Sequence, residues 1–163
     1  VNARHRPERR AELTCLAQGR QDIVFLDDLM SAAERDALLL SCDCYISLHR
    51  SEGHGLPLAE AMASGKPVVA TAYGGNTEFM TNDNSYLVRW TPASVGPNVE
   101  HYPAEARWAE PDIENAAHLL QAVRGNSQEA RRKVHRARID VEEKLSPAAI
   151  GAQMRERLRE MVR

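Results

Sequence analysis

Long hydrophobic runs are missing from this chain of 163 residues. No stretch of about 18 consecutive apolar side chains occurs, which excludes a transmembrane helix. The chain opens with Val-Asn-Ala-Arg-His-Arg, which does not resemble a signal peptide. Because it does not begin with Met, we interpret it as a fragment of a longer protein. Internal repeats and low-complexity segments are also absent.

Cysteine is scarce, with only three residues, Cys15, Cys42 and Cys44. An odd number does not form a disulfide framework, and Cys-x-Cys is not a zinc-binding spacing, so we expect free thiols in a reducing cytoplasm. The net charge of −2 and the hydrophobic fraction of 43% are those of an ordinary soluble domain. A single domain of this length buries roughly 70% of the surface of its unfolded chain.

Short apolar segments that alternate with helical ones indicate the fold class. Pro7 begins a helix that runs to Ala17, and Ser31 with Glu34 forms a capping box before the next helix. The predicted strands are apolar throughout, as in a parallel sheet covered on both faces. They cover residues 23–26, 44–48, 67–71 and 86–88, with short helices at 58–64 and near 76–80. We therefore predict an α/β, Rossmann-like parallel sheet with helices on both faces.

The stretch from Arg89 to Pro111 contains four prolines and little periodicity. Such a long segment without an element is unusual in a compact domain, so we interpret it as a surface strap anchored by Tyr102 and Trp108. A functional lid is the alternative.

Three helices are predicted after this stretch. They cover residues 113–123 behind the N-cap Asp112, residues 127–145, and residues 147–162 behind the N-cap Ser146. Two apolar faces follow from their spacing: Ala130, Val134, Ala137, Val141 and Leu145, and Ile150, Met154, Leu158 and Met161. We assign residues 1–125 to one Rossmann-like domain and residues 126–163 to its C-terminal helices.

The clearest indication of function comes from residues 51–65. Their sequence is Ser-Glu-Gly-His-Gly-Leu-Pro-Leu-Ala-Glu-Ala-Met-Ala-Ser-Gly. Gly53 and Gly55 follow a predicted strand and precede a helix that has Pro57 in its first turn. A strand, a Gly-rich turn and a helix N-terminus together form a site for an anion such as phosphate. Glu52 and Glu60 on either side are acceptors that suit vicinal hydroxyls. Phosphate flanked by hydroxyls describes a nucleotide-sugar.

This segment resembles the retaining GT-B glycosyltransferases of family GT4, the group 1 glycosyltransferases. The similarity rests on Glu-x7-Glu (Glu52 and Glu60) with Gly-x-Gly-Leu-Pro between the two glutamates, on Gly-Lys-Pro-Val-Val, on Gly74-Gly75-Asn-Thr-Glu78 and on Tyr86-Leu-Val88. It covers roughly residues 20 to 125 and implies the C-terminal donor-binding domain. Leu-His-Arg-Ser-Glu-Gly and Trp108-Ala-Glu-Pro-Asp112 look like a branch rich in polysaccharide mannosyl- and rhamnosyl-type transferases.

The resemblance also implies what lies outside the chain. In the family, the acceptor domain and the first strand of the donor domain precede this region, with an Arg and a Lys that clamp the donor diphosphate. We therefore expect the isolated chain to bind donor weakly and to be inactive.

The resemblance assigns roles to particular residues. Glu60 would bind both ribose hydroxyls, with an exposed glutamate near a helix N-terminus as the simpler alternative. Glu52, our candidate catalytic residue, would contact a hydroxyl of the transferred sugar, or else be a solvated loop residue. His54 stands where the family most often has Phe and would form a wall of the sugar pocket rather than act as a base. The remaining candidate donor-binding residues are Gly53, the backbone N–H groups of His54, Gly55 and Leu56, and also Arg50, Gly74 and Gly75.

Alternatives remain for the last three. Arg50 would neutralise phosphate or belong to a structural ion pair. Gly74 and Gly75 would line the site or form a tight turn. His49, like Arg50, is expected to point towards the site.

No cofactor and no metal are expected, because Asp-x-Asp, which usually holds the diphosphate through Mn²⁺ or Mg²⁺, is absent. The expected partners are a nucleotide-sugar donor, a saccharide or lipid-linked acceptor, and the N-terminal GT-B domain, but not nucleic acid. The basic run Arg131–Arg138 is interpreted as a solvated helix face, with peripheral contact to the inner membrane surface as the alternative. The rival to an enzyme is a non-catalytic nucleotide-binding module on the same fold.

Overall fold

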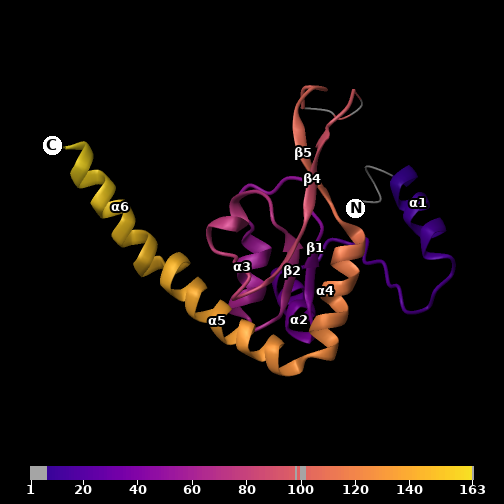
Figure 1. The fold of residues 1–163 in the computed structure, drawn as a ribbon, viewed down its shortest axis with the longest axis horizontal. Helices are drawn as coiled ribbons and strands as arrows, with labels where there is room; N and C mark the ends of the chain where they lie inside the picture. The colour runs from indigo at the N-terminus through magenta and orange to yellow at the C-terminus, as the bar shows by residue number, and fades with distance from the viewer. Residues whose placement is uncertain (1–6, 98, 100–101, 163) are drawn as a thin grey trace. The chain divides into compact units, whose positions relative to one another are not determined.

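The computed structural model describes residues 7–97, 99 and 102–162, and the chain divides into two compact units, Val1–Leu38 and Leu39–Arg163. The first unit contains helix α1 (Pro7–Ala17), which has the predicted bounds (Figure 1). The backbone turns left-handed at Gln18 and Gly19, with φ of 50° and 70°, and this ends the helix.

The predicted strand at residues 23–26 is wrong. These residues form no strand, and Val24 is 75% exposed. An apolar run becomes a strand only where a neighbouring strand accepts its backbone hydrogen bonds. No segment among the described residues pairs with this one. Helix α2 (Ala32–Ser41) follows, and its capping box is confirmed, because Glu34 accepts the N–H of Ser31 at 2.8 Å and Ser31 Oγ accepts the N–H of Glu34 at 3.3 Å.

The second unit is built on a parallel sheet of three strands in the order β1 (Tyr45–Ser47), β2 (Val68–Thr71) and β3 (Tyr86–Val88). The predicted strands in these places are confirmed, although two of them are shorter than expected. Helix α3 (Leu56–Ala63) joins β1 to β2, and a 3₁₀ turn, η1 (Gly75–Glu78), follows β2.

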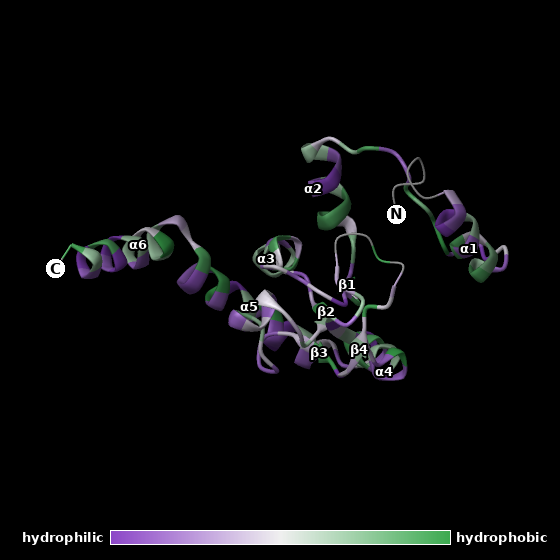
Figure 2. Cartoon of the chain, turned by 90° about the horizontal axis from the view of Figure 1, so that it is seen from above, coloured by the Kyte–Doolittle hydropathy of each residue, from purple (hydrophilic) through white to green (hydrophobic). Residues whose placement is uncertain are grey.

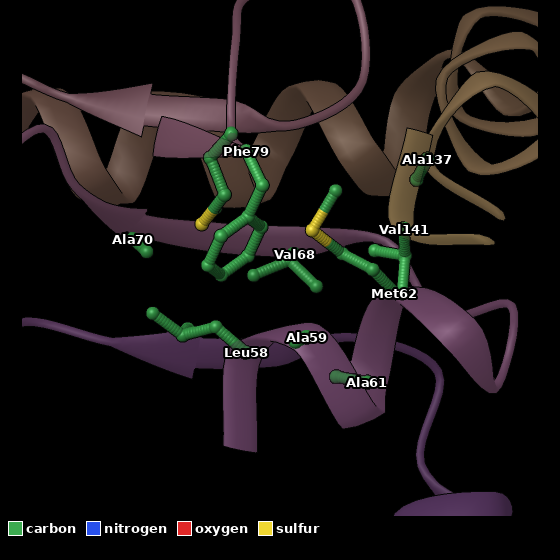
Figure 3. Packing of buried hydrophobic residues seen from close by; sticks show 10 residues of the cluster. Leu58, Ala59, Ala61, Met62, Val68, Ala70, Phe79, Ala137 and Val141 are labelled. Atoms are coloured by element: carbon green, nitrogen blue, oxygen red, sulfur yellow. The ribbon is translucent and has the colours of Figure 1, made fainter. Parts of the chain in front are cut away.

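Alternate residues of β2 point to opposite faces of the sheet and are buried on both. Val68 and Ala70 pack with Leu58 and Met62 of α3 and with helix α5 (Ser127–Leu145). Figure 3 shows this core, with Phe79 between the strands and α3. Val69 lies on the other face, in a cluster with Tyr86, Val88 and helix α4 (Ile113–Gly125). The predicted arrangement, a sheet covered on both faces, is confirmed.

A two-stranded antiparallel ribbon occupies the stretch for which no element was predicted. Its strands are β4 (Trp90–Ser94) and β5 (Arg107–Pro111), and they begin and end beside the carboxyl end of β3 (Figure 1). The expected packing of Tyr102 is wrong, because its side chain is 53% exposed, whereas Trp108 is half-buried against Arg50. Proline in both strands hid the ribbon, because proline donates no hydrogen bond and normally argues against a strand.

Asp112 and Ser146 are confirmed as N-caps of α4 and of α6 (Pro147–Met161). The predicted inner face of α5 is buried or half-buried along its length. The second predicted face, on α6, is exposed. Its members are Ile150, Met154, Leu158 and Met161, and Figure 2 shows hydrophobic and hydrophilic bands on this helix.

The basic run on α5 is not uniformly solvated. Lys133 is only 7% exposed and donates to the carbonyl oxygens of Asn82 and Ser85. Arg136 pairs with buried Asp140, which also accepts a hydrogen bond from Asn84 at 2.7 Å. One cation of the run therefore anchors the loop before β3, and only part of the run faces solvent. No helix among the described residues is both long and apolar enough to cross a membrane.

Candidate functional site

The Gly-rich turn lies where the sequence predicts it, between the carboxyl end of β1 and the first residue of α3. Gly55 caps α3 with a φ of 90°, a left-handed conformation that favours glycine. A Cβ there would lie 3.1 Å from the side chains of both Asn76 and Leu58. Position 55 is thus restricted twice, by its backbone and by its neighbours. Pro57 occupies the first turn of α3, as predicted.

The Glu52 carboxylate closes the turn on itself. Its Oε1 accepts the N–H of Gly55 at 2.9 Å and that of His54 at 3.3 Å. The Glu52 carboxylate therefore already accepts hydrogen bonds from two of the three N–H groups that the sequence analysis assigns to binding of the sugar donor. The third belongs to Leu56, the first residue of α3, where helix N–H groups have no partner within the helix.

A second loop, residues 72–76, packs against the turn at very short range. Gly75 donates its N–H to the carbonyl oxygen of Glu52 at 3.0 Å. A Cβ on Gly75 would lie 2.0 Å from the carbonyl oxygen of Gly53, and one on Gly74 would lie 2.4 Å from that of Glu52. The two glycines thus let one backbone touch another, and they place the second loop directly behind Glu52.

His49, which lies between β1 and the Gly-rich turn, joins the end of β1 to the second loop. Its Nε2 lies 2.9 Å from the carbonyl oxygen of Tyr73, and its Nδ1 lies 3.1 Å from Ser47 Oγ. A carbonyl oxygen only accepts, so Nε2 donates, and in the neutral ring Nδ1 accepts from the Ser47 hydroxyl. Both nitrogens of His49 therefore have partners within the protein. His54 instead is exposed, and its ring packs at 5.9 Å against Phe79.

The two glutamates of the motif both lie close enough to Tyr45 for their charges to affect its pKa. Glu60 is exposed in the second turn of α3, because the helix begins at Leu56, two residues earlier than predicted. Burial, and then the negative charges of Glu52 and Glu60, raise the pKa of Tyr45 on β1. Both carboxylates thus affect the ionisation of the same side chain, the phenol of Tyr45.

Arg50 does not point freely towards the site. Its Nη2 lies 2.7 Å and 2.9 Å from the two carboxylate oxygens of Glu110 on β5, and its guanidinium lies 5.0 Å from the centre of the Trp108 ring. The structure therefore shows the ion-pair alternative for this residue. Glu110 was missed, because it is 60 positions away and no local pattern links the two residues.

A hollow of about 540 Å³ lies at the opposite end of the sheet. Cys44 and Pro67, which precede β1 and β2, line it together with Leu120 and Val123 of α4. Because it lies at the amino ends of the strands, it is separate from the Gly-rich turn. Burial raises the pKa of the Cys44 thiol there to about 11, which keeps it in the thiol form at neutral pH.

Comparison with known proteins places the chain in a family. The family model "Glycosyl transferases group 1" matches residues 7–94. The chain belongs to the group 1 glycosyltransferases. A curated relative is the MMP alpha-(1->4)-mannosyltransferase of Mycolicibacterium hassiacum, which is 42% identical over 79 residues, 47% of this chain and 19% of the relative.

Solved structures confirm the fold as that of a C-terminal GT-B domain. The C-terminal domain of the group 1 protein LpcC from Francisella tularensis matches with a TM-score of 0.68 at 21% identity, over 88% of this chain and 65% of that one. HepE from Anabaena, in complex with UDP and glucose, matches with 0.72 at 19% identity, over 96% and 38%. Sucrose-phosphate synthase from Thermosynechococcus elongatus gives 0.66 at 23%, over 95% and 35%. This chain therefore spans only part of the length of each of these proteins.

Proposed function

We propose that the chain is the donor-binding domain of a retaining GT4 glycosyltransferase. The reaction is transfer of a sugar of the mannose or rhamnose type from a nucleotide-sugar to a saccharide or lipid-linked acceptor, in polysaccharide synthesis on the cytoplasmic side. The observation that carries the proposal is the turn itself, in which Glu52, two glycines and the N-terminus of α3 meet at the carboxyl end of a parallel sheet. Ligands of open α/β sheets bind at that end.

Each group of the turn has a part in this proposal. Glu52 uses Oε1 to hold its own turn, so its other oxygen is the acceptor for a hydroxyl of the transferred sugar. Glu60 accepts the ribose hydroxyls. The positive end of α3, with the N–H of Leu56, faces the diphosphate and stabilises it as a leaving group. No side chain is assigned as a nucleophile.

The comparisons favour a nucleotide-sugar as the ligand. HepE has been solved with UDP-glucose, and the curated relative is named as a mannosyltransferase. The diphosphate clamp is assigned to the first part of the donor domain, before this chain, and the acceptor site to the N-terminal GT-B domain. A non-catalytic nucleotide-binding module is the second candidate. The retention of both glutamates argues against it, since binding a nucleotide alone does not require the sugar contact of Glu52.

Thermal-shift measurements on the complete protein test the proposal. UDP-glucose, GDP-mannose and dTDP-rhamnose are added in turn, and one of them is expected to raise the melting temperature. Glu60→Ala should then weaken binding of that donor by about 1.5–3 kcal/mol, since a hydrogen bond to a charged group is lost. Glu114→Ala removes an exposed glutamate from the first turn of α4 and serves as the matched control. Unchanged donor affinity in a folded Glu60→Ala variant would refute the assignment.

A further inference from the structure

The ribbon β4–β5 is attached to both loops of the candidate site. From β5, the N–H of Ala109 donates to the carbonyl oxygen of Arg50 at 2.9 Å, just before the Gly-rich turn. From β4, Trp90 Nε1 donates to the carbonyl oxygen of Ala72 at 2.7 Å, and its ring packs edge-on against Tyr73 at 4.8 Å. Figure 1 shows the ribbon standing on the sheet at this end. The ribbon thus joins two loops that are about 20 residues apart in the chain.

The side chain of Arg50 adds a second attachment. It meets both carboxylate oxygens of Glu110 and packs over Trp108, so that one face of β5 holds the guanidinium by charge and by its ring. The main chain and the side chain of Arg50 are therefore both fixed by the same strand.

Only one residue separates Arg50 from Glu52. The Glu52 carbonyl oxygen is held in turn by the N–H of Gly75, and its carboxylate by the N–H groups of its own turn. The turn is thus bounded on one side by β5 and on the other by the second loop. A shift of Arg50 is transmitted through a single residue, Ser51, to the glutamate that would bind the sugar.

We propose that Arg50 and Glu110 act as positioning residues, which fix the direction in which Glu52 presents its carboxylate to a hydroxyl of the nucleotide-sugar. The nature of that ligand rests on the proposed function, whereas the coupling between ribbon and turn does not. In this proposal the charge of Arg50 serves Glu110, whose two carboxylate oxygens both lie near Nη2, rather than the donor phosphate.

The variant Glu110→Ala separates the two roles by the sign of its effect. If Arg50 were a phosphate ligand, release from Glu110 would leave donor affinity unchanged or increase it. If Arg50 positions the turn, affinity falls, on the order of tenfold, as for the loss of one contact in a coupled pair. Glu105→Ala removes the same charge from another exposed position between the two strands of the ribbon and is the matched control.

Two measurements on the complete protein are combined. Hydrogen–deuterium exchange follows the amides of residues 51–55 and of Gly75, and calorimetry follows binding of UDP-glucose, GDP-mannose and dTDP-rhamnose. In Glu110→Ala we expect faster exchange in these two segments, unchanged exchange in α4 and α5, and weaker donor binding. The double variant Arg50→Glu with Glu110→Arg restores the ion pair with its charges reversed. It should recover most of the wild-type protection from exchange and most of the wild-type donor affinity.

Each outcome decides one of the two proposals. Wild-type exchange and wild-type affinity in Glu110→Ala would overturn the positioning role. A double variant that binds the donor more weakly than either of its single variants would also overturn it. If the wild-type protein binds none of the three nucleotide-sugars, the proposed function fails, and the exchange data still decide whether the ribbon holds the turn.

Discussion

Replacing Gly75 by alanine tests the contact between the two loops of the site. The added Cβ would lie 2.0 Å from the carbonyl oxygen of Gly53 and 2.9 Å from the Cα of His54. Carbon atoms make ordinary contact at about 3.5 Å, so the loops would have to separate by roughly 1.5 Å. Both obstructing atoms belong to the backbone, and no side-chain rotation relieves them.

The expected cost follows from two opposing effects. Forcing extra volume into a packed contact costs about 1–3 kcal/mol. Alanine restricts the unfolded chain more than glycine does, which returns about 0.4–1 kcal/mol. We therefore expect a net loss of roughly 1–2 kcal/mol. Gly53→Ala is the matched control, because a Cβ there meets no atom within 4 Å and its φ is not left-handed. It should be neutral or slightly stabilising.

Urea denaturation of the complete protein measures both variants. The two tryptophans of this chain, Trp90 and Trp108, lie in the ribbon, so their fluorescence reports on the structure next to the site. Gly75→Ala should also weaken donor binding, since the N–H of Gly75 holds the Glu52 backbone. Equal stability of the Gly75→Ala and Gly53→Ala variants would refute the close contact.

Two further predictions concern metal and pH. Turnover of the complete enzyme should survive EDTA, because the N-terminus of α3 is proposed to stabilise the diphosphate; a loss of activity that Mn²⁺ or Mg²⁺ reverses would reveal a metal site. Although burial opposes it, hydrogen bonds from Arg136 and Asn84 lower the pKa of Asp140. Its contribution to stability is therefore present above the ordinary carboxyl pKa of about 3.9 and is lost as the pH falls through the lower, folded-state value. Urea midpoints between about pH 7 and pH 3 should consequently fall more steeply for the wild type than for Asp140→Asn, and parallel curves would contradict this role.

The sequence by itself determined the features that depend on neighbours in the chain. The capping box at Ser31 and the N-caps Asp112 and Ser146 bind N–H groups three residues away, so their partners are visible in the sequence. The strands at β2 and β3 and the inner face of α5 follow from apolar patterns that repeat at fixed spacing. The Gly-rich turn was placed correctly for the same reason, since a strand, two glycines and a proline specify it locally.

Only the tertiary structure decided the contacts between distant segments. Residues 23–26 have the composition of a strand but lack a partner, and the ribbon became a strand pair despite its prolines because β4 and β5 pair with each other. Lys133 looked like part of a solvated run until the loop before β3 supplied carbonyl oxygens for it. Arg50 found its acid 60 residues away. In each case the free energy of the contact depends on a group whose position is set by the folded chain and not by spacing along the sequence.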